Sequence, residues 1–181
     1  MSNELLNIGI ILGSTRTGRV SPQVGKWVLE LASKNKDANY EIIDIKSFNL
    51  PFLGTEGQSE NVSKFNKKIE SLDGFIFVVC EYNHSISGAL KNALDSVRDG
   101  WINKAAGIVS YGSAGGARAA EHLRGICAEL QIADVRTHIV LSTFNDFDNG
   151  KFQPLDVHSK NVDVLLNQVN AWSKALKPLR K

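Results

Sequence analysis

Short apolar runs alternate along the chain with segments in which apolar residues recur every three or four positions. The run Leu5–Leu12 is almost continuously apolar, which is typical of a strand covered on both faces. The segment Val24–Leu31 has its apolar residues on one helix face, and Ser21-Pro22 is a suitable start for that helix. The same alternation predicts strands at 5–12, 40–45, 75–80, 105–111 and 135–141. Further helical stripes are predicted within Val62–Leu72, Ala89–Val97, Ala120–Leu130 and Val162–Trp172.

Five strand–helix units with short connections predict an α/β fold. Parallel strands need crossovers between them, and these crossovers place helices on the faces of the sheet. We therefore expect a doubly wound five-stranded parallel sheet with helices on both faces, in one domain over residues 1–181. The run Phe75–Cys80 is the most apolar and is predicted to be central, whereas 135–141 alternates polar and apolar residues like an edge strand. Residues 142–159 are irregular, and are either a surface excursion or part of a neighbour's binding site.

Composition and charge narrow the class of protein. Apolar residues make up 43% of the 181 residues and charged residues 22%, as in ordinary globular proteins. A net charge of +2 is too weak for non-specific nucleic-acid binding, and no apolar run approaches the ~20 residues that cross a bilayer. Cys80 and Cys127 lie far apart, so we expect packed thiols rather than a disulfide or a zinc site. We expect a cytoplasmic protein without nucleic-acid or membrane partners.

The loop Gly13–Ser21, between a buried strand and a helix, has the features of an anion site. Backbone N–H groups, the helix N-terminus, hydroxyls, Arg16 and Arg19 can all converge there, and a phosphate monoester suits that chemistry. A nucleotide P-loop has Lys and Ser or Thr where this chain has Arg19 and Val20, which disfavours a triphosphate-cleaving enzyme. The alternative is a plain strand–helix turn with solvated arginines.

Two further loops follow predicted strands. Glu81–Gly88 follows the most apolar strand and combines an acid, an aromatic ring, an amide and a histidine. The backbone of such a loop can bond the edge of a flat heterocycle, although its polar side chains alternatively serve only as local turn caps. Gly112–Gly116 exposes N–H groups that no side chain screens. In a doubly wound sheet such loops meet at the carboxyl ends of the strands, where ligands bind.

The three loops together resemble those of the NADPH-dependent FMN reductase family. The resemblance lies in GSTR after the first strand, EYNHS with GALKNALD after the third and YGSAGGAR after the fourth, within residues 5–140. It implies a flavodoxin-like fold, bound FMN and hydride transfer from NADPH or NADH to quinones, azo dyes, metal oxyanions or free flavin. It also implies a homodimer or homotetramer, with the helix Leu90–Asp95 in the interface. Cys80 and Ser87 stand where the family usually has proline.

The resemblance also assigns roles to individual residues. The phosphate of FMN is expected at the first loop and the isoalloxazine ring at the other two, bonded mainly by backbone groups. The residues expected to bind the cofactor are Gly13, Ser14, Arg16, Arg19, Val20, Ser21, Glu81, Tyr82, Asn83, His84, Ser85, Gly112, Ser113 and Gly115. No catalytic acid or base and no metal ligand is expected, because the flavin carries the redox chemistry.

Several alternatives stay open at this stage. A flavodoxin-like electron carrier has the same fold, but such carriers tend to be strongly acidic and to flank the flavin with aromatic residues, and this chain is slightly basic. The choice between NADPH and NADH is not decided by the sequence, and Arg118 is a hypothetical contact to a 2′-phosphate. Trp27, Trp101 and Trp172 are expected to be packing residues, with Trp101 near enough to the flavin loops to join an interface.

Overall fold

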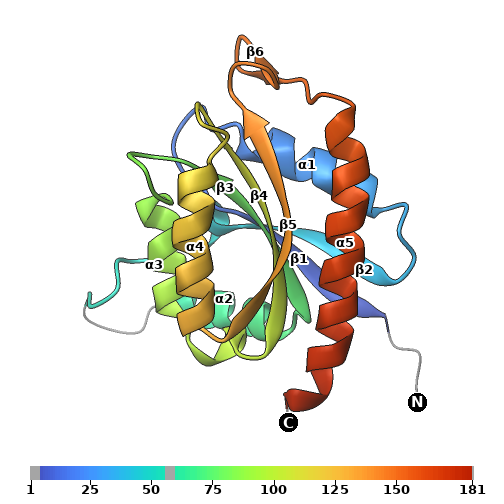
Figure 1. The fold of residues 1–181 in the computed structure, drawn as a ribbon. Coiled ribbons are helices and arrows are strands. Elements are labelled where there is room, and N and C mark those ends of the chain that lie inside the picture. The colour runs from blue at the N-terminus through green and yellow to red at the C-terminus, as the bar shows by residue number, and fades with distance from the viewer. Residues whose placement is uncertain (1–4, 56–59, 181) are drawn as a thin grey trace.

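The computed structural model describes residues 5–55 and 60–180, and its main feature is one parallel sheet (Figure 1). The five strands are β1 (Leu6–Leu12), β2 (Ala38–Asp44), β3 (Gly74–Cys80), β4 (Lys104–Gly112) and β5 (Ile132–Ser142). They pair in parallel in the order β2-β1-β3-β4-β5. This is the flavodoxin-like order, with its switch point between β1 and β3, and it confirms the predicted fold class.

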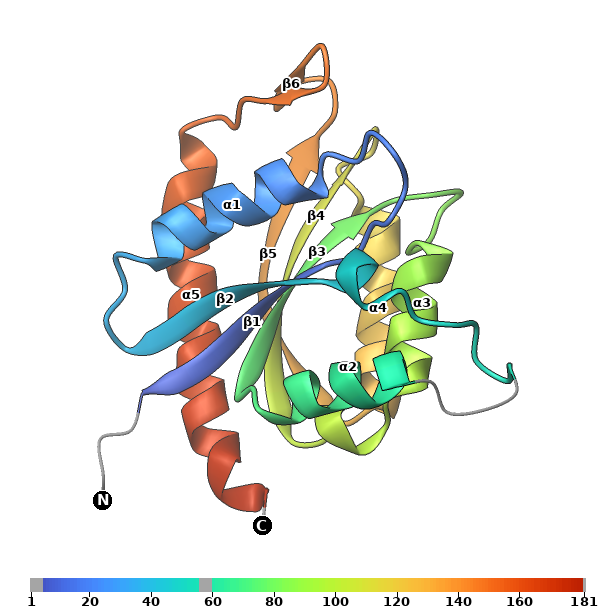
Figure 2. The same cartoon turned by 180° about the vertical axis from the view of Figure 1, so that it is seen from behind.

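Helices cover both faces of the sheet, as predicted. α1 (Ser21–Ala32) and α5 (Val157–Leu176) lie on one face, and α2 (Glu60–Glu70), α3 (Gly88–Ser96) and α4 (Ala117–Glu129) lie on the other (Figures 1 and 2). Three short 3₁₀ helices lie among the described residues. η1 (Ile45–Phe48) follows β2, η2 (Asp99–Trp101) precedes β4, and η3 (Lys177–Leu179) follows α5. Every residue of β3 is buried, because this strand has neighbours on both edges and helices on both faces.

The structure confirms Trp101 as a packing residue, but its predicted place at an interface and the predicted packing of Trp172 are wrong. Trp101 is fully buried among the rings of Phe65, Phe75 and Phe77, and its indole N–H donates to the carbonyl of Leu94 at 3.1 Å, so it does not join an interface near the loops. Trp172 is 47% exposed, although the periodicity places it on the apolar stripe of α5. Beyond Val169 the buried residues of α5 are Asn170 and Ser173, and Trp172 is not among them.

The irregular stretch after β5 packs against its own chain. It contains a two-stranded hairpin, β6 (Phe147–Asp148) with β7 (Lys151–Phe152), which lies beyond the carboxyl end of the sheet (Figure 1). The side chain of Gln23 in α1 donates to the carbonyl of Gly150 at 3.0 Å and accepts from the N–H of Phe152 at 2.9 Å. The buried Asp146 carboxylate accepts from the N–H groups of Ser142 and Leu155 and closes the excursion.

A histidine on the edge strand is bonded to the neighbouring strand. His138 Nε2 lies 2.7 Å from Ser110 Oγ, and that hydroxyl donates to the carbonyl of Gly115 at 2.6 Å. Since a hydroxyl has one proton, Ser110 accepts from His138, which is then the neutral Nε2–H tautomer. Burial, and secondarily the positive charge of Arg124, lower the pKa of His138 from 6.5 to about 4.

This shift predicts acid sensitivity. The unfolded chain takes up a proton at His138 near pH 6.5 and the folded chain only near pH 4, so the free energy of unfolding falls as pH drops between these values. We expect a loss of about 2 kcal/mol at pH 4.5 relative to pH 7, allowing for partial exposure of the ring. Urea unfolding of the wild type and of His138→Asn, which does not titrate, checks this. Parallel pH profiles for the two proteins would contradict it.

Candidate functional site

The three loops singled out in the sequence meet at the carboxyl edge of the sheet. Gly13 donates its N–H to the carbonyl of Val78 at 2.9 Å, and its own carbonyl accepts from the Ser87 hydroxyl at 2.5 Å. The N–H of Glu81 donates to the carbonyl of Tyr111 at 3.1 Å. The loops after β1, β3 and β4 are therefore joined by hydrogen bonds into one surface, at the switch point where doubly wound proteins bind ligands.

Two hydroxyls in the first loop are buried without a partner. Ser14 and Ser21 are 1% and 0% exposed, and neither Oγ has a hydrogen-bond partner among residues 5–55 and 60–180. The Cys80 thiol lies close enough to Ser14, and the Tyr111 hydroxyl close enough to Ser21, for each serine to lower its neighbour's pKa against the larger raising effect of burial, but neither contact meets the geometry of a full hydrogen bond. A buried unsatisfied hydroxyl costs about 1–3 kcal/mol, so this pair points to a group that bonds them when present.

The N-terminus of α1 is open toward the same loop. Its N-cap residue, Val20, offers no side-chain hydrogen bond, and the first turn holds no acidic residue. The partial positive charge of this twelve-residue helix is therefore not neutralised by the chain itself. Together with the hydroxyls of Ser14 and Ser21, the helix end provides the donors that a phosphate group needs.

The two arginines of this loop, Arg16 and Arg19, have different partners. Arg19 is bonded to both carboxylate oxygens of Asp44, at 2.6 and 2.5 Å, and to the carbonyl of Ser14 at 2.6 Å. This pairing raises the pKa of Arg19. Burial is the largest single influence on the pKa of Asp44 and would raise it, but the hydrogen bonds from Arg19 and from the N–H of Lys46, together with the positive charges of both residues, hold that pKa below its usual value. The guanidinium of Arg19 thus braces the loop, whereas the exposed Arg16 lies over the ring of Tyr82, 5.8 Å from its centroid.

The second loop is a tight hairpin with an unusual backbone. Tyr82 and Ser85 exchange N–H to carbonyl hydrogen bonds of 2.9 and 3.0 Å. Between them, Asn83 and His84 have φ angles of 46° and 73°, in the left-handed region that most side chains avoid. Such strain persists only where the surroundings impose it, and it clusters at ligand-binding loops. The side chains of Tyr82, Asn83 and His84 are exposed.

Glu81 does not face the open part of the site. Its carboxylate accepts from the backbone N–H groups of Arg118 and Ala119 at the start of α4, and from the guanidinium of Arg118. Burial would raise the pKa of Glu81, but the hydrogen bonds from Arg118 and Ala119 outweigh it and lower that pKa. Glu81 therefore joins the second loop to the third, and Arg118 is already ion-paired.

The third loop is held close to the sheet by glycine. Gly115 and Gly116 have φ angles of 67° and 74°, and a Cβ on Gly116 would lie 2.8 Å from the backbone N of Tyr111. The Ser110 hydroxyl on the carbonyl of Gly115 fixes this turn from below. Gly112 is the last residue of β4, and its carbonyl accepts hydrogen bonds from the N–H groups of Gly115 and Thr143. The next residue, Ser113, is exposed.

The structure thus brings the predicted site residues to one edge but gives some of them an internal bond. Gly13, Ser14, Arg16, Val20 and Ser21 surround one open loop end, and Tyr82–Ser85 and Gly112–Gly115 lie beside it. Sequence reasoning overlooked the part that Asp44, Ser110 and His138 play in positioning these loops, and it considered Ser87 only as a local turn cap. Two of these residues have a signal in the sequence. Asp44 stands at the end of a predicted strand, and Ser87 stands just before a helical stripe, where an N-cap is expected.

Comparison with known sequences gives consistent matches. The NADPH-dependent FMN reductase family matches residues 6–146. An NAD(P)H-dependent FMN reductase of Schizosaccharomyces pombe is 33% identical over 175 residues, covering 91% of this chain and 88% of that protein. An NAD(P)H:quinone oxidoreductase of Solanum tuberosum is 36% identical over 134 residues, which cover 69% of this chain and 69% of that protein.

Comparison with solved structures agrees on the fold. FerB, a flavoenzyme NAD(P)H:(acceptor) oxidoreductase from Paracoccus denitrificans, superposes with a TM-score of 0.78 at 18% identity, covering 95% of this chain and 99% of that one. Within residues 5–55 and 60–180, no helix has the length and apolar character needed to cross a membrane. The family match includes all five sheet strands and the three loops at their carboxyl edge, and the chain belongs to the NADPH-dependent FMN reductase family.

Proposed function

We propose that this chain holds FMN across the three loops and is an oxidoreductase that takes hydride from NADPH or NADH for a small-molecule acceptor. The acceptor class is quinones, azo dyes, metal oxyanions or free flavin. The observation that carries the assignment is the pair of unpartnered buried hydroxyls, Ser14 and Ser21, at the open N-terminus of α1. The relatives named FMN reductase and quinone oxidoreductase support the same assignment.

The first loop fits the phosphate of FMN. Ser14 and Ser21 would donate to phosphate oxygens, and the N-terminus of α1 would stabilise their negative charge. Arg16 is free to leave the face of Tyr82 and pair with the same group. Arg19 would act indirectly, because its hydrogen bonds to Asp44 hold the loop in place. We therefore assign Arg19 a positioning role rather than a direct contact to the phosphate.

The other two loops fit the edge and faces of a flat ring. The backbone of Asn83 and His84 is held in a strained turn, and Gly112–Gly116 leaves main-chain N–H groups unscreened by side chains. When bound, FMN supplies the hydride chemistry, so that the chain itself needs no acid–base group. The chain's part is to orient the ring, with Glu81 locking the second loop to α4 and His138 locking the third through Ser110.

Removing the unpartnered hydroxyl of Ser14 tests FMN affinity separately from folding stability. For Ser14→Ala we expect a FMN dissociation constant about tenfold higher, because a hydrogen bond to a charged phosphate is lost. The free energy of unfolding of the apoprotein should stay level or rise by about 1 kcal/mol, since an unsatisfied buried group is removed. Fluorescence titration and urea unfolding measure the two quantities.

Two controls accompany this variant. Riboflavin, which lacks the phosphate, should bind Ser14→Ala and wild type equally. Ser33→Ala removes an exposed hydroxyl at the other end of α1, where it donates to the carbonyl of Glu30, and should leave FMN binding unchanged. A tenfold loss of riboflavin affinity as well would mean that Ser14 acts on the loop and not on the phosphate.

Turnover without a partner protein tests the enzyme against an electron carrier. We expect FMN-loaded protein to bleach on anaerobic mixing with NADPH or NADH, and to regain its colour when benzoquinone is added. A flavodoxin-like carrier would stay oxidised until a separate reductase was supplied. A colourless preparation that takes up no FMN would refute the assignment altogether.

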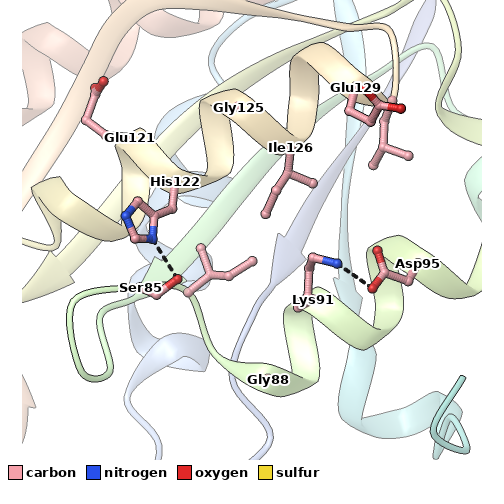
Figure 3. A pocket seen from close by; sticks show the side chains of 11 residues that line it. Ser85, Gly88, Lys91, Asp95, Glu121, His122, Gly125, Ile126 and Glu129 are labelled. Atoms are coloured by element: carbon pink, nitrogen blue, oxygen red, sulfur yellow. Dashed lines mark hydrogen bonds and ion pairs between the residues drawn. The ribbon is translucent and has the colours of Figure 1, made fainter.

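The face formed by α3 and α4 suits self-association. A groove of about 890 Å³ runs between these helices, with Ile86, Ile126 and Leu130 in its lining and Lys91 paired to Asp95 at 2.5 Å (Figure 3). The groove reaches Ser85, whose hydroxyl lies 2.9 Å from His122 Nδ1, so a second copy seated there would adjoin the flavin loops. A homodimer, or a homotetramer built from two such dimers, is the assembly that we favour.

A charge placed in this groove should prevent assembly. For Ile126→Glu we expect sedimentation equilibrium to give the mass of one chain, where wild type gives at least two, because an apolar contact is replaced by a desolvated carboxylate. Val164→Glu, at a 47% exposed position on α5, should leave the mass unchanged. An unaltered mass for Ile126→Glu would exclude this face.

Location and domain organisation complete the proposal. Cys80 and Cys127 are buried free thiols, the form that a reducing compartment maintains, which favours the cytoplasm. The five main strands share one sheet, and the hairpin after β5 packs on α1. Both features favour a single FMN-binding domain over residues 1–181.

A further inference from the structure

We propose that a second pocket, between the segment after β2 and the start of α3, binds the adenosine half of the nicotinamide dinucleotide. The proposal rests on the proposed function, because it concerns the hydride donor of that reaction. The pocket has a volume of about 520 Å³, within the range of small-molecule sites. It is lined by Thr15 of the first loop, by residues of 45–52 and by the first turns of α3.

The pocket adjoins two of the loops assigned to FMN. Thr15 lies between the buried Ser14 and the exposed Arg16. Gly88, on the opposite wall, follows Ser87, whose hydroxyl bonds the carbonyl of Gly13. The reactive and adenosine halves of a nicotinamide dinucleotide are joined only by a pyrophosphate. A dinucleotide with its nicotinamide over the flavin must therefore place its adenosine half nearby, and this pocket adjoins the loops concerned.

An exposed aromatic ring is held at the rim of this pocket. Phe52 is 79% exposed, although a free phenyl ring in water gains nothing for folding. Its neighbours are fixed by one side chain: Asn92 of α3 donates to the carbonyl of Pro51 at 2.9 Å and accepts from the N–H of Leu53 at 2.9 Å. The backbone on both sides of Phe52 is thus clamped to α3. A fixed, exposed ring is the element on which an adenine base stacks.

The same pocket offers positive charge. Lys46 is exposed and forms no ion pair within the described part of the chain, and Asp44, two residues before it, is already bonded on both oxygens by Arg19. The first turn of α3 contains no acidic residue. The groove between α3 and α4 differs, because Asp95, Glu121 and Glu129 line it, with Lys91 and His122 as the basic residues of the lining. Phosphates therefore favour the pocket at Lys46, and we assign Lys46 to the 2′-phosphate of NADPH.

A truncated donor isolates the adenosine half. Reduced nicotinamide mononucleotide carries the same reacting ring as NADPH but no adenosine. For Phe52→Ala we expect KM for NADPH to rise about tenfold at unchanged kcat, the size of one lost base stack, and kinetics with the mononucleotide to stay within twofold of wild type. Trp172→Ala, which removes an exposed ring on the far face, should change neither. An equal rise with both donors, or no rise with NADPH, would overturn the proposal.

Binding of the isolated fragment gives a readout independent of turnover. Calorimetry of the FMN-loaded protein with adenosine 2′,5′-bisphosphate should show one site, weakened about tenfold by Lys46→Ala and unaffected by Lys160→Ala on α5. The Lys46→Ala variant should also lose more efficiency with NADPH than with NADH. Equal affinity of wild type and Lys46→Ala for the bisphosphate would remove Lys46 from the site.

The two proposals fail in different ways. If wild type binds FMN and oxidises the mononucleotide but Phe52→Ala and Lys46→Ala leave NADPH kinetics unchanged, only the pocket assignment is wrong. If wild type neither holds FMN nor oxidises any donor, the proposed function itself is wrong. A change of sedimentation mass in Phe52→Ala would instead assign the ring to contact between copies.

Discussion

Because β1, β3 and β4 pair in parallel, the chain leaves all three strands at the same edge of the sheet, and three loops must be accommodated side by side. Short hydrogen bonds between backbone groups do this, from Gly13 to Val78 and from Glu81 to Tyr111. Buried strands set the positions of these bonds, so the loops inherit the rigidity of the core. The site is thereby built mainly from main-chain groups whose positions the sheet dictates.

Several ionisable side chains near the site form hydrogen bonds or ion pairs within the chain and so stabilise its loops. Arg19 is committed to Asp44, Glu81 to the start of α4, and His138 is kept neutral and bonded to Ser110. What remains available to a ligand is a helix N-terminus, two buried hydroxyls and an exposed arginine. This arrangement suits a protein whose cofactor performs the chemistry, because the groups left for the ligand are fixed dipoles and donors that do not compete with the cofactor for protons.

The fold followed from the sequence more completely than the site did. Continuous apolar runs such as Phe75–Cys80 alternate with segments of helical period, so strands and layers were predictable from local pattern. The exposure of Trp172 was not, because burial depends on what packs against a residue from elsewhere in the chain. For the same reason the loops were predicted but the pairing of Arg19 was not, since Asp44 lies 25 residues away. The left-handed backbone of His84 has no local signature either.

The buried hydroxyls of Ser14 and Ser21 have a consequence for the lifetime of the polypeptide. Each lowers the free energy of unfolding of the bare chain, and a ligand that satisfies them stabilises only the folded form. Since proteases act on unfolded chains, our assignment of these hydroxyls to FMN implies faster clearance of copies made during vitamin B2 shortage than of copies made in plenty. Abundance of the protein is then coupled to supply of its cofactor without any dedicated sensor.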